Sequence, residues 1–384
     1  MRATIVGVGP LLETIRDETG MSTTVAGLLT TLPVICFGVL AGVAPRLARR
    51  FGIDLMIWLT MAGLTIGILV RLASPVILLF IGTLVIGASI ALANVLVPAV
   101  IKRDFPQRTG LMTGVYTMCM VAGGSLASGL MVPIHERSRL DWRETLALLG
   151  VPALVAVVVL IPRLRLNSRS RESAESRAVA APRLWRSGLA WQVSLFMGLQ
   201  SFIYFGMGSW IPTLLIDEGL SDARAGLMWS LCNLAGLPFS FIVPVLAQRV
   251  RDQRPLVVGA VAVWAVSIAG LLVAPADYTL LWMVCFGVAG GSSLSLALMF
   301  IVLRSPDAAH AAVLSGMAQA IGYTLAAFAP FLFGALHDLT GGWEASSAMI
   351  GLVLVPTLWS GWFAGQRRLV VPLPESPASR PRSR

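Results

Sequence analysis

The chain has 384 residues, of which 56% are hydrophobic and only 12% are charged. A soluble domain carries about twice that share of charge, so the composition excludes an ordinary soluble protein and predicts an all-α membrane protein. The net charge of +10 does not indicate nucleic-acid binding, because the basic residues gather in short clusters between apolar runs, as in membrane proteins.

Twelve apolar runs follow one another along the chain. A spanning helix needs about 20 predominantly apolar residues, and every run except the first is long enough. Apolar residues surround these segments on all faces, so we expect helices in lipid or in a bundle. The runs lie at about 3–15, 23–44, 54–73, 76–101, 111–133, 144–161, 188–215, 223–247, 256–274, 279–303, 311–335 and 344–364.

The basic residues between the runs predict the orientation of the helices. One alternate set of loops, together with the C-terminal tail, carries 22 Arg and Lys residues, and the other set carries six. Positive charge favours the cytoplasmic side. We therefore expect the Arg-rich loops and both termini in the cytoplasm, and the chain in a plasma (inner) membrane of the bacterial type.

The two halves of the chain resemble each other at an offset near 200 residues. AGLLTTL at 26–32 matches AGLMWSL at 225–231. Several matches in order argue for duplication of a six-helix unit, which is the transporter pattern. Further matches are Pro45 with Pro244, Gly87 with Gly287, Pro106 with Pro306 and Gly114 with Gly316.

The repeat and the composition predict four regions. We expect an N-terminal six-helix half at 1–162, a Ser- and Arg-rich cytoplasmic linker at 163–187, and a C-terminal six-helix half at 188–366. The remaining residues, 367–384, are expected to form a disordered cytoplasmic tail.

The repeat also predicts that the first helix is N-terminally truncated. Met1 corresponds to Ile203, whereas the matching helix of the second half begins near Gly188. We expect that about 15 or more further residues, mostly apolar, are encoded in frame upstream. The alternative is a truncated or degraded gene.

Four stretches resemble the cyanate permease and 2-nitroimidazole transporter group of the major facilitator superfamily. The resemblance implies twelve helices in two six-helix halves. The chain departs from the group's pattern at Met1, where a Leu usually follows an Asn, and at Arg49, which stands where the superfamily's loop motif has Asp. An interdomain salt bridge of the usual kind is therefore not implied. The stretches are 2–52, NVLVPAVIKRDFPQRTGLMTGVY at 94–116, QSFIYFGMGSWIPTLL at 200–215 and MAQAIGYTLAAFAP at 317–330.

Arg2 is the first candidate for a substrate-binding residue. By the repeat it lies level with Tyr204, in the middle of the membrane. A guanidinium at a helix centre costs about 2.5–3.5 kcal/mol, which a wet cavity and an anionic solute would offset. We predict that Arg2 contacts an anion. The alternative is that Arg2 is a frayed terminus.

Two helices of the second half carry the pattern Gln-x-x-x-Tyr. Gln200 precedes Tyr204 by four residues, and Gln319 precedes Tyr323 by four, which puts each pair on one helix face. Polar groups inside a bundle are expensive and mark functional sites by default. We predict that both pairs line a solute cavity. The alternative is that they hydrogen-bond each other between helices.

Four other side chains inside helices are candidates for the same site. Asn94 is predicted to line the cavity, because helix four usually does so in the superfamily. Tyr116 and Asn233 are further candidates, with helix–helix hydrogen bonding as the alternative for Asn233. Trp210 is also a candidate, although its place near a helix end is typical of an interfacial anchor.

The sequence predicts no catalytic residue, metal site or cofactor. Cys36, Cys119, Cys232 and Cys285 lie inside apolar runs without metal-ligand spacing, which indicates unpaired core thiols. An enzyme is not expected, because no nucleophile–base pair or metal-ligand cluster can be read from the chain. No carboxylate lies deep in an apolar run, which argues against an Asp or Glu proton relay. Proton entry with a substrate anion, exchange and facilitated diffusion remain open.

The predicted function is secondary active transport of a small anion or nitrogen-containing solute, cyanate-like, by alternating access. One alternative is an exporter of drugs or toxic compounds, whose pocket would be larger and more aromatic. Another is a non-transporting membrane sensor, which would need a soluble signalling domain. The expected partners are the solute and the lipid bilayer, without nucleic acid, and the protein is expected to act as a monomer.

Overall fold

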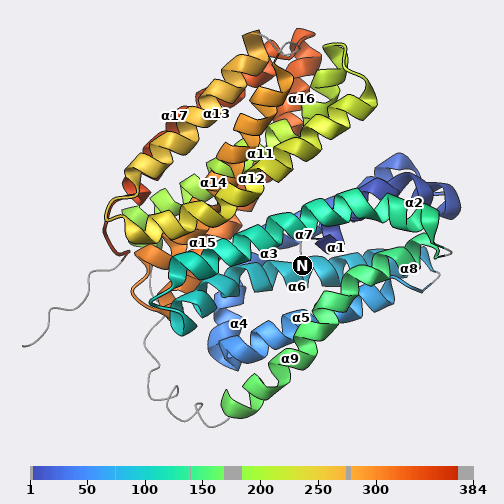
Figure 1. Cartoon of the computed structure of the whole chain (residues 1–384). Coiled ribbons are helices and arrows are strands. Elements are labelled where there is room, and N and C mark those ends of the chain that lie inside the picture. The colour runs from blue at the N-terminus through green and yellow to red at the C-terminus, as the bar shows by residue number, and fades with distance from the viewer. Residues whose placement is uncertain (1–2, 74, 139, 168–183, 274–277, 371–384) are drawn as a thin grey trace, which may run out of the picture.

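The computed structural model describes residues 3–73, 75–138, 140–167, 184–273 and 278–370. Every regular element in these ranges is a helix, as the composition predicts. The helices gather into two bundles, one from the first part of the chain and one from the second (Figure 1).

The first bundle begins with three short elements, and long helices follow. Its elements are α1 (Ala3–Val6), η1 (Gly9–Leu11), α2 (Leu12–Thr19), α3 (Thr23–Ala41), α4 (Ala44–Phe51), α5 (Ile53–Val70), α6 (Val76–Asp104), α7 (Thr109–Arg137), α8 (Trp142–Ala147), η2 (Leu148–Gly150) and α9 (Val151–Asn167).

The second bundle contains mostly long helices. Its elements are η3 (Leu184–Arg186), α11 (Gly188–Asp217), α12 (Asp222–Arg249), α13 (Arg254–Val273), α14 (Thr279–Arg304), α15 (Ala308–Ala327), α16 (Ala329–Thr340) and α17 (Glu344–Ala364).

Ten helical stretches of the described residues are long and apolar enough to cross a membrane. The pair α3 and α4 makes an eleventh if it counts as one span, and its two helices are bent by 61°. The sequence predicts one continuous run there. The helix breaks because Gly42 is a poor helix former, and Pro45, in the first turn of α4, is favoured at a helix start.

Burial separates a central helix from a peripheral one. In the most apolar 18-residue stretch of α14, 83% of the residues are buried. In the corresponding part of Trp142–Leu164, only 22% are buried. Apolar side chains of that peripheral stretch point outward, and Val159 is 66% exposed. A bilayer supplies the apolar surroundings that such a surface needs.

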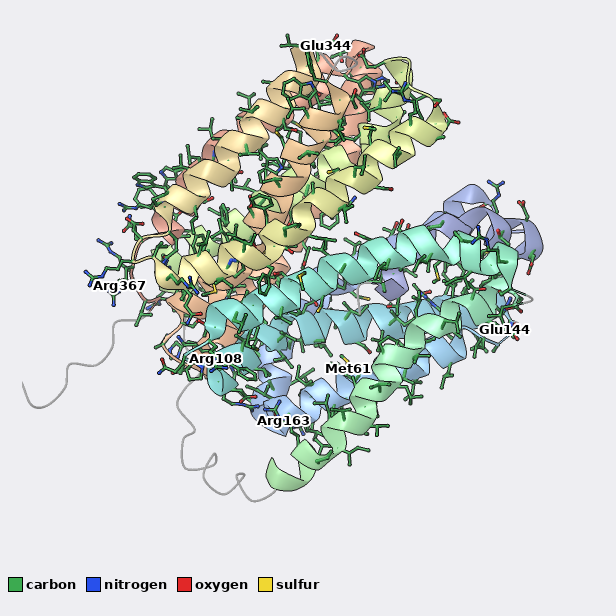
Figure 2. The ribbon with its side chains drawn as sticks, viewed as in Figure 1. Met61, Arg108, Glu144, Arg163, Glu344 and Arg367 are labelled. Atoms are coloured by element: carbon green, nitrogen blue, oxygen red, sulfur yellow. The ribbon has the colours of Figure 1, made fainter. Side chains whose placement is uncertain are left out.

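The two bundles touch at one end and diverge toward the other (Figure 1). Arg108, Arg163 and Arg367 lie at the touching end, whereas Glu144 and Glu344 lie at the opposite end (Figure 2). We call the touching end the Arg-rich end. It is the end that the loop charges predict to be cytoplasmic.

Two boundaries differ from the predicted ones. Helix α9 continues to Asn167, past the predicted start of the linker at 163. The predicted tail also begins too early, because the Val370 amide donates to the Arg304 carbonyl at 2.9 Å and the Ser187 hydroxyl donates to the Val370 carbonyl at 3.0 Å. The rest of the predicted tail, 371–384, lies outside the described residues.

The four cysteines are unpaired thiols. Cys36 and Cys232 are buried, and Cys285 is partly buried. Cys119 is exposed, so the prediction of a core position is wrong there. An apolar helix at the edge of a bundle also has an outward face, and periodicity could not distinguish that face from the inner one.

Candidate functional site

A cavity of about 140 Å³ lies between the two bundles. Helices α1, α3, α6 and α7 line it from the first bundle, and α11, α12, α14 and α15 line it from the second. Asn94 and Tyr204 lie in the middle parts of the long helices α6 and α11. The cavity therefore lies at the mid-depth of the spans.

The polar groups of the lining are neutral amides, hydroxyls and phenols. None of the described lining residues carries a charge. Amides and phenols both donate and accept hydrogen bonds, so this wall suits an uncharged polar molecule. The polar lining residues are Asn94, Gln200, Ser201, Tyr204, Asn233 and Tyr323.

Tyr204 and Asn233 form a fixed pair on the wall of the second bundle. The Tyr204 hydroxyl donates to Asn233 Oδ1 at 2.7 Å, and Asn233 Nδ2 donates to the Trp229 carbonyl at 2.9 Å. The Tyr204 ring packs against Trp229, with centroids 5.9 Å apart, and stacks on Phe286 at 6.3 Å. These contacts hold the phenol and the amide in place before a ligand arrives.

Asn94 lies on the wall of the first bundle and has two partners behind it. Tyr116 donates from its hydroxyl to Asn94 Oδ1 at 3.0 Å. Gln319 Nε2 donates to the Asn94 carbonyl at 3.0 Å and to Ser315 Oγ at 2.9 Å. Tyr116 and Gln319 are absent from the described lining. Gln319 instead joins α15 to α6 across the two bundles.

The two Gln-x-x-x-Tyr pairs are placed differently. In α11 both Gln200 and Tyr204 line the cavity, and Gln200 Nε2 also donates to Ser201 Oγ at 2.6 Å. In α15 only Tyr323 does so. Its ring lies 5.3 Å from that of Phe37, so this contact also crosses between the bundles.

Glycines keep part of the wall free of side chains. A Cβ on Gly236 of α12 would lie 2.6 Å from the Gly287 carbonyl oxygen, and a Cβ on Gly291 of α14 would lie 2.3 Å from the Gly236 oxygen. The backbones of α12 and α14 therefore touch at the cavity, which only glycine permits.

Two further predicted candidates are not among the described lining residues. Trp210 is outside the lining: its Nε1 donates to the Pro330 carbonyl at 2.8 Å, and its ring fills the space beside Gly334. Trp210 therefore joins α11 to α16 within the second bundle. Arg2 lies outside the described residues, although Ile5 and Val6 shortly after it line the cavity.

The sequence reasoning missed Phe37, Ser201 and Phe205 in the lining. Ser201 and Phe205 directly follow Gln200 and Tyr204, so adjacency was an available signal. No signal in the sequence indicated Phe37, because an apolar residue in an apolar helix can face either a cavity or lipid.

Two arginines that the charge distribution assigns to loops are buried instead. Arg71 is 4% exposed and Arg304 is 3% exposed. Arg71 donates through Nη2 to Thr83 Oγ1 at 2.8 Å and through Nη1 to the Thr4 carbonyl at 3.2 Å. It therefore holds α1 against the start of α6, away from the described cavity lining.

Comparison with known proteins places this architecture in a family. Residues 2–330 match the Major Facilitator Superfamily. A 2-nitroimidazole transporter of Escherichia coli (strain K12) is 38% identical over 358 residues, which cover 93% of this chain and 90% of that protein. A cyanate transport protein of the same organism is 29% identical over 359 residues, which cover 92% and 91%.

Solved structures show the same fold. A proton:xylose symporter matches with a TM-score of 0.74 at 16% identity, over 94% of each chain. The fucose:proton symporter of Escherichia coli matches with a TM-score of 0.70 at 11% identity, over 95% of this chain and 97% of that one. At these identities the likeness concerns the fold alone. The family match and the curated relatives together show that this chain is a multi-pass membrane transporter of the major facilitator superfamily, in the group of the 2-nitroimidazole and cyanate transport proteins.

Proposed function

We propose that the protein moves a small, uncharged, nitrogen-containing solute by alternating access, and that the cavity between the bundles binds it. The observation that carries this proposal is a cavity at mid-span, walled by both bundles and lined by neutral polar groups. A solute there touches both bundles, so rocking of one bundle against the other would change the side from which it is reached.

The cavity volume limits the size of the solute. About 140 Å³ is close to the roughly 150 Å³ of an engineered cavity that holds one benzene molecule. One small ring fits, which disfavours an exporter of large drug-like compounds. The faces of Tyr204, Phe205 and Tyr323 suit a planar ring, and the amides of Asn94 and Asn233 can bind ring nitrogen or nitro groups.

The relatives support a nitrogen compound, since one is named for 2-nitroimidazole and another for cyanate. The uncharged lining of the described cavity makes the neutral heterocycle the first candidate. Cyanate, with Arg2 as its predicted contact, is the second.

The contact between the bundles supports an outward-facing state. The bundles touch at the Arg-rich end (Figure 1), which we propose to be cytoplasmic because of its positive charge. In this state the solute would enter the cavity from the periplasmic side, and both chain ends would lie in the cytoplasm.

Counterflow in proteoliposomes tests the proposal. Vesicles loaded with unlabelled 2-nitroimidazole are expected to accumulate the labelled compound faster than protein-free vesicles. Tyr204→Phe and Asn233→Ala are each expected to weaken the apparent affinity by about fivefold, because a net hydrogen bond contributes roughly 1 kcal/mol. The matched control is Tyr278→Phe, at a tyrosine that is 62% exposed and outside the cavity, and it should leave counterflow unchanged.

Two results would change this conclusion. Counterflow of cyanate without 2-nitroimidazole would replace the neutral solute by the small anion, and loss of that activity in Arg2→Gln would support the predicted contact. Equal affinity in the Tyr204, Asn233 and Tyr278 variants would show that the cavity is not the binding site.

A further inference from the structure

A second, basic hollow opens at the Arg-rich end of the second bundle. Its volume is about 620 Å³. Three segments enclose it: the end of α12 with the following loop, the end of α14, and the residues after α17. No Asp or Glu occurs in its described lining. We call it the Arg pocket, after the five arginines that line it: Arg249, Arg251, Arg304, Arg367 and Arg368.

Arg304 is the buried and rigid member of the Arg pocket. It is 3% exposed, and its Nε donates to the Ala364 carbonyl at 2.8 Å. Its Nη2 donates to Gln253 Oε1 and, at 3.2 Å, to the Gly365 carbonyl. All these acceptors are neutral, so they orient the guanidinium without cancelling its charge. The remaining nitrogen, Nη1, makes no hydrogen bond to a described residue.

The loop after α12 carries a carboxylate, Asp252, whose contacts are with Arg254. Asp252 accepts from the Arg254 backbone amide at 3.0 Å and lies 3.9 Å from Arg254 Nη1. Asp252 is not part of the described lining. Asp252 still attracts Arg304 through space, but the described lining of the pocket holds five arginines and no carboxylate.

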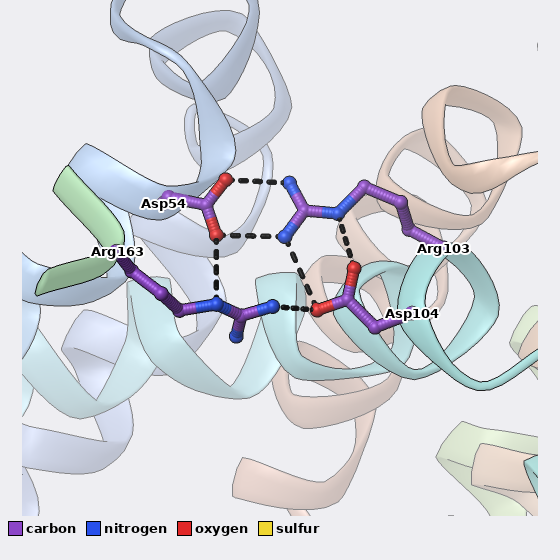
Figure 3. Close-up of polar contacts among 4 residues, drawn as sticks. All are labelled: Asp54, Arg103, Asp104 and Arg163. Carbon is purple, nitrogen blue, oxygen red and sulfur yellow. Dashed lines mark hydrogen bonds and ion pairs between the residues drawn. The ribbon is translucent and has the colours of Figure 1, made fainter. Parts of the chain in front are cut away.

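In the first bundle, carboxylates neutralise the arginines of the corresponding region (Figure 3). Arg103 Nη2 lies 2.7 Å from Asp54 Oδ1, and Arg103 Nε lies 2.7 Å from Asp104 Oδ1. Arg163 pairs with Asp104 and lies 3.9 Å from Asp54 Oδ1. Two guanidinium groups thus face two carboxylates, and the cluster is neutral.

The repeat relates the two places. Arg304 follows Asp104 by 200 residues, which is the offset of Gly87 and Gly287 and of Pro106 and Pro306. The second bundle thus has an arginine where the first has the carboxylate of Asp104. Like charges at close range repel each other unless an anion lies between them.

We propose that the Arg pocket binds a phosphate-bearing anion, which at this end of the spans is the headgroup of an anionic phospholipid. The planar donor fork of arginine matches phosphate oxygens, and basic pockets at helix ends hold such headgroups. Apolar surface for the acyl chains adjoins it. Val250 of the lining is 40% exposed, and Leu246 and Phe363 on neighbouring helix ends are 41% and 39% exposed.

Lipid binding to the purified full-length protein tests this site. The probes are phosphatidylglycerol, phosphatidylcholine with the same acyl chains, and inorganic pyrophosphate as a soluble phosphate. The readouts are the unfolding temperature during titration and lipid retention in native mass spectrometry. We expect phosphatidylglycerol to bind and to raise the unfolding temperature, and phosphatidylcholine to do neither.

The double variant Arg367→Gln/Arg368→Gln is expected to bind phosphatidylglycerol about 30-fold more weakly. Both side chains are exposed, so folding is retained, whereas loss of Arg304 would also release Gln253 and α17. The matched control is Arg49→Gln/Arg50→Gln, which removes the same charge from exposed positions of α4 and should bind as the parent does.

Each outcome decides the question. Equal weakening in the two double variants would mean diffuse attraction and would overturn the site. The same holds if phosphatidylglycerol binds no better than phosphatidylcholine and pyrophosphate has no effect. Binding of pyrophosphate alone, lost in Arg367→Gln/Arg368→Gln, would support the phosphate site and assign its ligand to solution.

Discussion

Two of the helix contacts between the bundles occupy equivalent places in the repeat. In one, Gly114 of α7 packs on the Phe241 carbonyl of α12; in the other, Gly316 of α15 packs on the Ala41 carbonyl of α3. A Cβ on these glycines would lie 2.7 Å and 2.8 Å from those oxygens. Duplication has therefore kept the close backbone approach on both sides.

The chemistry beside the two glycines differs. Between α7 and α12, the Gly110 amide donates to Gln248 Oε1 at 2.6 Å, and Gln248 Nε2 donates to the Gln107 carbonyl at 2.7 Å. Between α3 and α15, the contact brings the rings of Phe37 and Tyr323 together. The α7–α12 contact is thus held by polar groups, and the α3–α15 contact brings aromatic rings together.

The helices behind these contacts differ as well. Helix α12 passes Pro244 without a break, whereas the first bundle is interrupted and bent by 61° before Pro45. Phe241 stands in α12 where Gly42 stands at the break, at the offset that relates Pro45 to Pro244. Gly114 and Gly316, which the repeat preserves, thus fix the places where the two bundles come close. The neighbouring residues, which differ between the halves, decide which interactions stabilise each contact.

The largest effect is expected from filling the glycine contacts. Gly114→Val and Gly316→Val should each reduce counterflow at least tenfold, because overpacking costs about 1–3 kcal/mol and would keep the bundles from closing at the Arg-rich end. In a protein whose four native cysteines are replaced, a cysteine introduced at Thr113 should be alkylated faster in these two valine variants than in the parent. Thr113 is 1% exposed in this state.

Gly123→Val and Gly27→Val are the controls, because a Cβ at either glycine meets nothing within 4 Å. Loss of activity in only one of the two contact variants would show that the contacts are not equivalent. Parent-like counterflow and alkylation in both would contradict the role assigned to them.

A smaller effect should follow from removing the polar clamp of one contact. Gln248→Ala deletes two hydrogen bonds, each contributing about 0.7 kcal/mol, and should speed alkylation of the cysteine introduced at Thr113 about tenfold. Gln366→Ala is the control, since that side chain makes no hydrogen bond within the described part of the chain. An unchanged alkylation rate in Gln248→Ala would mean that the glycine packing alone holds the contact.

The smallest effect concerns the charge clusters at the same end. Asp54 is 9% exposed and its partner Arg103 is 33% exposed, so solvent screens part of their attraction. Asp54→Asn should lower the free energy of unfolding by about 1 kcal/mol at low salt, and by less at high salt. Thermal unfolding at two ionic strengths measures the change.

Asp252→Asn in the second bundle is the comparison variant. Its carboxylate is 53% exposed and 3.9 Å from its partner, so the change in stability should be smaller than for Asp54→Asn. Equal destabilisation by the two variants would contradict the conclusion that carboxylates stabilise the arginines in the first bundle more than in the second.

Much of the candidate site could be anticipated from the position of polar residues inside apolar runs. A bundle must turn such groups inward, and Asn94, Gln200 and Tyr204 do lie in the cavity lining. The rule does not say whether an inward group meets a cavity or a neighbouring helix. Gln319 meets the Asn94 carbonyl and Trp210 meets the Pro330 carbonyl, and no local pattern distinguished them from Tyr323.

The sequence by itself determined the membrane class, the helix succession and the repeat, because these depend on the length of apolar runs and on similarity along the chain. Only the tertiary structure decided the burial of Arg71 and Arg304 and the gathering of five arginines in a pocket whose described lining holds no carboxylate. Those features depend on which surfaces meet across long stretches of the chain, and side-chain packing decides which residues become partners.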